Sequence, residues 1–452
     1  MRDKPYNHRH RYLYGLREES RSILSLAVPS IISNVTVPLL GLVDLTIIGH
    51  IGDAAYISAI ATGSMIFNVI YWIFGFLRMG TSGITAQAFG QKSRKGTDSV
   101  LRLSVGMGAA IGMAFVALQF IILKFMLWAM NTPEESVALV ADYFDIVIWG
   151  APAMLSLYAL TGWFIGMQDT RVPMVVAIVQ NIINIVASLS LVFIAGWKVE
   201  GVAAGTLIAQ WAGLLMALLG VRYIRKRRAV VFAGQESRGE EQRVTFGSFF
   251  SVNRDIFLRT LCLVAVNMFF TSAGGKQGAL ILAVNALLIT LYTLFSYFMD
   301  GLAYAAEALC GKYYGAGDRQ RFSAVVRQLY IWGAVMVVAF TVLYVFGGQR
   351  FLSLLTDDGT VVRAAAGYMP WTVAIPVCGV LAFIYDGVFI GITATKGMLV
   401  SSAAASALFF AIYFLFMPSM GNNALWMAFL TFLAARGLVQ HLLLRRRLKY
   451  SK

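Results

Sequence analysis

The sequence predicts an all-α polytopic membrane protein with twelve transmembrane helices, arranged as two six-helix lobes related by a parallel pseudo-two-fold repeat. The 452 residues are 59% hydrophobic and 13% charged, whereas a soluble domain is closer to half apolar and a quarter charged. Apolar runs of about 20 residues, enough for one spanning helix, recur along the chain. Short motifs of the first half also recur in the second. Lipid is therefore the expected solvent for most of the chain.

Twelve apolar runs qualify as spanning helices, and the loops between them are short with one exception. That exception is residues 223–254, which hold Arg225-Lys-Arg-Arg228 and a polar stretch. The first 22 residues carry six lysines and arginines, which is typical of the start of a signal peptide. The apolar run that follows is too long for a signal peptide, so we expect the first helix to be retained. The predicted spans are 23–48, 54–80, 98–124, 138–165, 172–195, 200–222, 255–273, 279–308, 323–346, 364–390, 398–417 and 422–443.

The distribution of lysine and arginine predicts the orientation. Of the 37 basic residues, 29 fall on the side of the termini and the central linker, which is the cytosolic side because positive charge is retained there. The net charge of +15 thus reflects membrane orientation rather than nucleic-acid binding. We expect a multi-pass protein of a bacterial-type inner or plasma membrane. Its predicted regions are a cytosolic N-terminal segment (1–22), an N-terminal lobe (23–222), a cytosolic linker (223–254), a C-terminal lobe (255–443) and a basic cytosolic tail (444–452).

Two pairs of motifs indicate an internal duplication. Phe164-Ile-Gly-Met-Gln-Asp-Thr-Arg171 recurs as Phe389-Ile-Gly-Ile-Thr-Ala-Thr-Lys396 at an offset of 225. The stretch 80–90 resembles the stretch 301–311 at an offset of 221. Six helices per half is an even number, so both halves insert with the same orientation. The substrate path is then expected at the lobe interface or within a lobe.

Asp44 is the residue around which a function is predicted. It is the only acid between Leu24 and Ile51, within the first apolar run. A charge at this depth costs roughly 2.5–3.5 kcal/mol on insertion scales, so such residues usually handle protons or cations. The alternative is a structural aspartate that hydrogen-bonds backbone interrupted by Pro38.

Four motifs together resemble the multidrug and toxic compound extrusion (MATE) transporter family, in particular its DNA-damage-inducible protein F (DinF) branch. They are Pro38…Val43-Asp44…Gly49-His-Ile-Gly52, Phe76-Leu-Arg-Met-Gly-Thr-Ser-Gly83, Phe298-Met-Asp-Gly-Leu-Ala-Tyr-Ala-Ala-Glu-Ala308 and Asp386-Gly-Val-Phe-Ile-Gly391. The resemblance covers residues 20 to 443. It implies a V-shaped pair of six-helix lobes that exports organic, often cationic, compounds in exchange for protons or sodium.

The resemblance also implies an N-lobe site. In that family an aspartate on helix 1 is proposed to take the coupling ion or contact substrate, with partners on helices 5 and 6. Many members carry a second aspartate where this chain has Ser188, and a site with one carboxylate is a poorer sodium cage, so proton coupling is favoured over sodium. The alternative is that the asparagines and serine tie helices together. The matching set is Asp44, Asn181, Asn184, Ser188, Thr206 and Gln210.

The C-lobe has its own candidate polar site, formed by Asn267, Asp300 and Asp386. Other branches of the family place acidic cation ligands on helices 7 and 10; Asp386 fits the second position, while Asn267 replaces the acid of the first. Glu307 lies near a predicted helix end and is expected to be solvated. The alternative for the two aspartates is a local turn, or a salt bridge with Arg78, Arg259 or Arg436.

Tyr71 and Tyr292 are candidate cavity aromatics that would stack on planar or cationic drugs, unless they simply pack helices. Three widely spaced cysteines suggest neither a disulfide framework nor a metal site. No cofactor is expected beyond the coupling ion, a proton with sodium as the alternative. The expected partners are small organic cationic or amphipathic substrates and the lipid bilayer, with no nucleic acid and no second subunit.

These observations predict a secondary active multidrug or toxin exporter that runs as a cation-coupled antiporter. The alternative is a lipid-linked saccharide flippase of the same superfamily architecture. A flippase would need a cationic cavity for pyrophosphate, and the only basic residues well inside spans are Arg78, Arg259 and Arg436. An enzyme is not expected, because no HExxH pattern or Ser/His/Asp set falls within the predicted helices.

Overall fold

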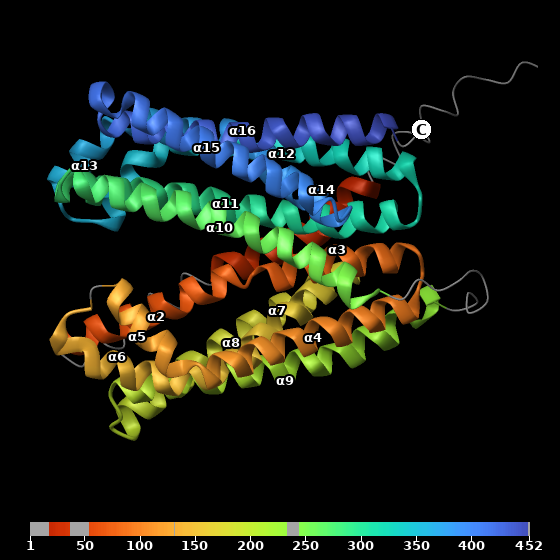
Figure 1. The fold of residues 1–452 in the computed structure, drawn as a ribbon, viewed down its shortest axis with the longest axis horizontal. Helices are drawn as coiled ribbons and strands as arrows, with labels where there is room; N and C mark the ends of the chain where they lie inside the picture. Colours follow the sequence, from red (N-terminus) through yellow and green to blue (C-terminus); the bar gives the residue numbers. More distant parts are fainter. Residues whose placement is uncertain (1–17, 37–53, 131, 233–243, 451–452) are drawn as a thin grey trace, which may run out of the picture. The chain divides into compact units, whose positions relative to one another are not determined.

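The computed structural model describes residues 18–36, 54–130, 132–232 and 244–450, and these form helices joined by short turns, without a β-strand (Figure 1). Asp44 and the rest of 37–53 lie outside the described residues. The helices are a first helix (18–36), α2 (Ala54–Ile73), α3 (Phe76–Gly90), α4 (Arg94–Ala117), α5 (Gln119–Ala129), α6 (Glu134–Val147), α7 (Ala151–Gly166), α8 (Arg171–Leu189), α9 (Val199–Phe232), α10 (Phe246–Lys276), α11 (Ala279–Gly315), α12 (Arg319–Leu355), α13 (Gly359–Ala366), α14 (Met369–Gly391), α15 (Thr395–Met420) and α16 (Asn422–Tyr450).

Eleven helical segments among the described residues are long and apolar enough to cross a membrane. The first predicted span, 23–48, is helical as far as residue 36 and then leaves the described part. The all-α polytopic class is confirmed. Several observed helices run beyond the predicted spans, because hydropathy marks only the lipid-crossing part, whereas a helix continues as long as its backbone and polar end residues find partners.

The end of α9 shows this effect. The span was predicted to stop at 222, but the helix continues to Phe232. Arg225 Nη2 pairs with an Asp98 carboxylate oxygen at 2.7 Å, and Arg227 Nη1 pairs with Asp169 Oδ2 at 2.9 Å. The other oxygen of Asp169 accepts from the backbone amides of Arg171 and Val172 at 3.0 Å each, which caps α8. The basic stretch is therefore helical and fastened to neighbouring helices.

The chain divides into two compact units, one containing residues up to Ile31 together with Ser251 onward, and the other containing Ile32–Phe250. In the Ile32–Phe250 unit, α3, α4, α8 and α9 surround α7. Trp163 of α7 is fully buried there, and its indole N–H donates to the Thr97 carbonyl at 3.0 Å. A cluster of apolar side chains from α3, α4, α7, α8 and α9 fills the space between these helices.

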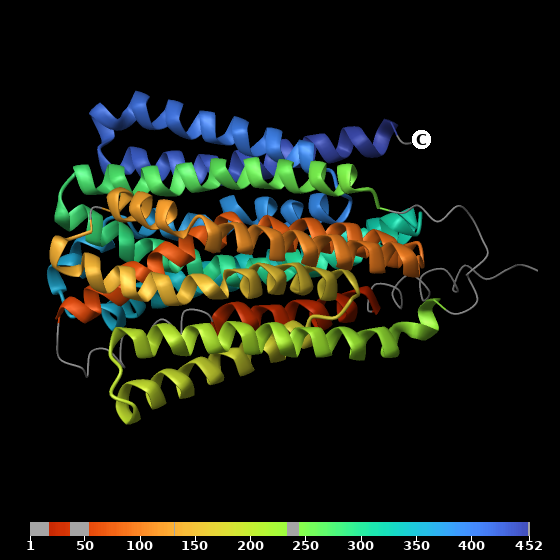
Figure 2. The same ribbon diagram turned by 60° about the horizontal axis from the view of Figure 1, so that its bottom comes forward.

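In the other unit, α14 is the central helix and packs against α11, α12 and α16. The helices α15 and α16 lie side by side, as the blue ribbons show in both views (Figures 1 and 2). The largest fully buried side chains of this unit include Trp426, Phe429 and Phe432 of α16. The arrangement of α11, α12 and α14 corresponds to that of α3, α4 and α7 in the first half.

Equivalent turns in the two halves have the same backbone conformation. Gln168, between α7 and α8, has φ of 63°, and Thr393, between α14 and α15, has φ of 51°. The next amide in each turn, that of Asp169 or Ala394, donates to the carbonyl five residues back at 3.0 and 2.8 Å respectively. Positive φ is uncommon for residues other than glycine, so its recurrence at an offset of 225 agrees with the first predicted motif pair.

The second motif pair, at an offset of 221, is out of register by about one helical turn. A Cβ added at Gly162 of α7 would lie 2.2 Å from the Arg78 carbonyl oxygen, and one at Gly387 of α14 would lie 2.4 Å from that of Ala303. Both the glycines and the residues that they face are 225 apart. Small residues recur each turn in closely packed helices, so a match displaced by four residues resembles the true one.

Candidate functional site

The helices α8 and α9 pack through polar side chains and glycines. Asn184 Nδ2 of α8 donates to Thr206 Oγ1 of α9 at 3.1 Å. One turn further along α8, Ser188 lies against Gly205, where an added Cβ would come within 2.3 Å of Ser188 Oγ. Three of the residues predicted for the N-lobe site therefore lie together. The Asn184–Thr206 bond is also what helix-tying side chains are expected to make.

Two buried oxygens on this face of α8 have no hydrogen-bond partner within the described part of the chain. They are Asn184 Oδ1 and Ser188 Oγ, on side chains that are 2% and 0% exposed. An unpaired buried polar atom costs about 1–3 kcal/mol, and most such atoms in folded proteins are paired. These two oxygens are thus candidate acceptors for a ligand at α8.

Asn181 connects α8 with the first helix. Its Nδ2 donates to the carbonyl of Thr36 at 3.4 Å, near the upper limit for a hydrogen bond. Thr36 precedes Asp44 by eight residues. The contact places the polar side of α8 beside the end of the first helix at Thr36.

Gln210 lies about one turn beyond Thr206 on α9 and has different neighbours. Its side chain fills the space beside Gly150, in the 3-10 turn between α6 and α7, and faces Tyr71 of α2. Tyr71 is buried, with its ring 5.7 Å from that of Phe67 and 6.4 Å from that of Tyr158. In the C-terminal half, the ring of Tyr292 packs edge-on against Phe429 at 5.1 Å. Both tyrosines take part in helix packing.

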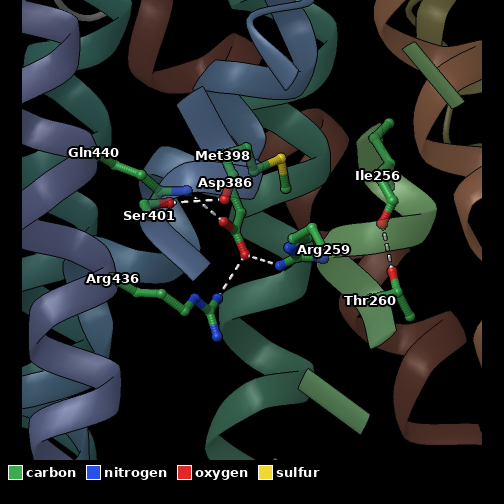
Figure 3. A network of polar contacts seen from close by, with 8 residues as sticks. All are labelled: Ile256, Arg259, Thr260, Asp386, Met398, Ser401, Arg436 and Gln440. Carbon is green, nitrogen blue, oxygen red and sulfur yellow. Dashed lines mark hydrogen bonds and ion pairs between the residues drawn. The ribbon is translucent and has the colours of Figure 1, made fainter. Parts of the chain in front are cut away.

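The carboxylate of Asp386 joins three helices of the C-terminal half (Figure 3). From α14 it accepts hydrogen bonds from Arg259 of α10 and, at 2.6 Å, from Arg436 Nη2 of α16. Gln440 Nε2, also of α16, donates to its other oxygen at 2.8 Å. All four side chains are buried. The salt-bridge alternative is therefore confirmed for Asp386, with two arginines rather than one.

The other two predicted C-lobe residues have different surroundings. Asp300 of α11 is half-buried and interacts electrostatically with Arg259, as Asp386 and Arg436 do. Two carboxylates therefore balance two guanidinium groups in this cluster. Asn267 lies further along α10 and donates to the Leu263 carbonyl of its own helix at 2.9 Å. The structure brings Asp300 and Asp386 together and leaves Asn267 apart from them.

The expectation that Glu307 is solvated is wrong. Its side chain is 1% exposed, because α11 continues two turns past it to Gly315 and α14 covers it. A Cβ added at Gly391 of α14 would lie 2.8 Å from the Glu307 carbonyl oxygen. A second buried acid, Glu19 at the start of the first helix, was not predicted to have a role.

Sequence reasoning also missed Gln440 as a partner of Asp386. Arginines inside apolar runs require an anionic partner, so Arg259 and Arg436 pointed to the kind of partner but not to its position. No comparable signal marks a glutamine near the end of the last helix. Among the described residues, no group of three or more His, Cys, Asp or Glu side chains could hold a metal ion.

Comparisons with known proteins agree with this architecture. The family model described as MatE matches residues 29–190 and 256–421. The DNA damage-inducible protein F of Escherichia coli (strain K12) is 38% identical over 427 residues, which are 94% of this chain and 91% of that protein. Protein DETOXIFICATION 44, chloroplastic, of Arabidopsis thaliana is 24% identical over 453 residues, covering 96% of this chain and 84% of that one.

A similar fold occurs among solved structures. One is described as the outward-facing conformation of a multidrug resistance MATE family transporter of the MOP superfamily. It superposes with a TM-score of 0.84 at 17% sequence identity, covering 96% of this chain and 97% of the other. At this identity the likeness concerns the fold alone.

Proposed function

We propose, from the premise that the chain belongs to the MatE family, that it exports organic cations across the membrane in exchange for protons. As a member of that family it is a multi-pass membrane transporter rather than an enzyme. Its relatives include proteins named for DNA damage and detoxification. Family membership supports export of the multidrug or toxin type. We further propose that the coupling ion is a proton, that the substrate is cationic and that the protein is a monomer.

The observation that carries the proposal is the polar face of α8. It combines two buried acceptor oxygens, on Asn184 and Ser188, that lack a partner within the described ranges with a contact from Asn181 to the first helix. Neutral amide and hydroxyl groups suit a monovalent organic cation if Asp44, as we propose, supplies a single carboxylate to the same site. The carboxylate supplies the charge, and the neutral groups supply acceptors.

Protons are favoured over sodium because the C-terminal half offers no free carboxylate at the family's helix 10 position. Asp386 already receives three hydrogen bonds, from Arg259, Arg436 and Gln440. A hard cation such as sodium requires several oxygen ligands, and the positive charge of two guanidiniums repels it. A single carboxylate at Asp44 suffices for one proton.

The same ion cluster argues against the lipid-linked saccharide flippase. Two of the three basic residues inside the spans, Arg259 and Arg436, are neutralised by Asp386 and Asp300. They are then poorly suited to receive a pyrophosphate, which would have to displace a paired carboxylate.

In the proposed cycle, protonation of Asp44 from outside neutralises it and releases the bound cation outward. Deprotonation toward the cytosol restores the cation site. Net exchange requires that proton and substrate compete for Asp44 or favour different states of the transporter.

Purified protein in liposomes tests the proposal, with a fluorescent organic cation and imposed gradients. We expect a pH gradient to drive uptake or efflux and a sodium gradient at constant pH to have no effect. Asp44→Asn should abolish proton-driven transport, while Asp145→Asn, which alters an exposed carboxylate of α6, should preserve it. Normal proton-driven transport by Asp44→Asn would refute the mechanism, and transport driven by sodium alone would reassign the coupling ion.

A further inference from the structure

Glu19 is a buried carboxylate that the proposed cycle does not use. It lies in the first turn of the first helix, and its side chain is 5% exposed. The hydroxyl of Tyr313, on α11, lies 3.2 Å from each of its carboxylate oxygens and donates to them. Its sequence neighbour Glu18 is exposed. Adjacent residues of a helix face different directions, so Glu19 faces α11 while Glu18 faces solvent.

Groups from two other helices surround this carboxylate. Arg321 of α12 and Lys312 of α11 attract its negative charge, Glu18 repels it, and the thiol of Cys310 on α11 lies within electrostatic range. Arg321 also interacts with the Tyr313 hydroxyl and lies 5.8 Å from its ring centre. Burial is the largest effect on Glu19, and it raises the pKa of the carboxyl above the ordinary value of 4.5.

Two further contacts hold the same stretch of chain. The indole N–H of Trp332, on α12, donates to Ser20 Oγ at 2.9 Å. Further along, Gly301 of α11 faces the first helix so closely that an added Cβ would lie 2.3 Å from Ile31 Cγ1. Residues 19–31 therefore lie along α11 and α12 and are fastened at both ends.

The first helix is shared between the two compact units. Up to Ile31 it belongs to the unit that contains α11 and α12, and from Ile32 it belongs to the other unit. Pro29 lies just before this change, and a proline removes one backbone hydrogen bond and permits bending. The helix therefore passes from one unit to the other close to a residue that permits bending.

We propose that Glu19, Tyr313 and Arg321 form a proton-sensitive latch that holds residues 18–31 against α11 and α12, and that release of this latch accompanies transport. The link between latch release and transport rests on the proposed export function and on the proposed cytosolic position of the N-terminus. The latch itself does not depend on either.

The direction of the pH effect follows from the burial of Glu19. A carboxyl whose pKa is higher in the docked state than in the released state binds its proton more tightly when docked. Docking of residues 18–31 is then strongest when the pH is below 4.5, the ordinary pKa of a glutamate carboxyl. It weakens as the pH rises through the raised pKa of Glu19. Acidification of the side that faces Glu19 tightens the latch, and alkalinisation loosens it.

Cys310 is proposed as an internal reporter of latch opening, because it is 0% exposed and lies within electrostatic range of Glu19. In a Cys262→Ser/Cys378→Ser background it is the single thiol of the chain. We expect N-ethylmaleimide to label it faster when residues 18–31 leave α11, and the rate is measured in purified protein at fixed pH without substrate or gradient. The measurement needs no transport, so its outcome is separate from that of the liposome assay.

We expect Glu19→Gln to label several-fold more slowly than the parent, because glutamine keeps an acceptor for Tyr313 and loses the buried charge. Tyr313→Phe should label about tenfold faster, since it removes a hydrogen bond to a charged group. Glu18→Gln, which changes the exposed neighbour, should match the parent. Loss of a negative charge near Cys310 would by itself favour the thiolate and speed labelling, so slower labelling of Glu19→Gln reports tighter docking.

Labelling of Glu19→Gln at or above the parent rate, or an equal effect of Glu18→Gln, would overturn the latch. Its role in transport has a second readout in liposomes. The efflux rate of Glu19→Gln should vary less than that of the parent when only the pH on the N-terminal side is changed. If Glu19→Gln and the parent have the same pH profile, the latch plays no part in transport. Absence of efflux in the parent would instead contradict the proposed function.

Discussion

Asp386 illustrates how the surroundings of one residue decide between two roles that its sequence position permits. In sequence it stands at a position where other family branches place a cation ligand. In the structure its carboxylate holds Arg259 and Arg436 together with Gln440. Removing these charges from water is costly, and the cluster is tolerable only because the charges compensate one another. An acid so engaged serves to hold α10, α14 and α16 together.

Replacement of Asp386 by asparagine should therefore destabilise the protein by about 3 kcal/mol or more, because two buried guanidiniums then have only the half-buried Asp300 as counter-charge. Unfolding of detergent-solubilised protein, by heat or denaturant, measures the loss. Asp145→Asn, at an exposed carboxylate of α6, is the control and should change stability by no more than about 0.5 kcal/mol. Equal stability of the two variants would show that the cluster does not hold the three helices together.

At the scale of helices, the close approach of α7 to α3 and of α14 to α11 depends on glycine. Gly162 and Gly387 occupy equivalent positions of the repeat, and each faces a backbone carbonyl of the neighbouring helix at a distance too short for a Cβ. A carbonyl in a helix is fixed by its own hydrogen bond and cannot move aside as a flexible side chain would. The two central helices are therefore held to their neighbours by backbone contact.

Gly162→Ala and Gly387→Ala should each destabilise the fold by about 1–3 kcal/mol, as overpacked cores do. Gly106→Ala in α4 is a matched control, because nothing lies within 4 Å of a Cβ at that position, and alanine in a helix is favoured over glycine by about 0.5–1 kcal/mol. Thermal unfolding of the three variants tests this. Stability of Gly162→Ala or Gly387→Ala equal to that of Gly106→Ala would contradict the close approach.

At the scale of the whole molecule, the repeat fixes topology. Both halves contain the same order of helices, with equivalent turns at an offset of 225. Two halves that each cross the membrane an even number of times insert in the same orientation. We therefore expect the basic residues at the termini and in 223–254 to gather on one side of the membrane.

Epitope tags at the two termini should accordingly be cut by protease from the same side, in inside-out but not in right-side-out vesicles. A tag inserted in the turn at Gly196, between α8 and α9, should show the opposite pattern and serves as the control. Termini on opposite sides would rule out a parallel repeat.

The sequence by itself determined the membrane class, the helical content, the duplication and the family, because each depends on local composition or on motifs that are contiguous in the sequence. It also gave a salt bridge with Arg78, Arg259 or Arg436 as one alternative for Asp300 and Asp386. Only the tertiary structure decided that Asp386 pairs with Arg259 and Arg436, that Glu307 and Glu19 are buried, and that α3 aligns with α11 one turn away from the best local match. These depend on which helix faces touch, and hydropathy does not distinguish one apolar face from another.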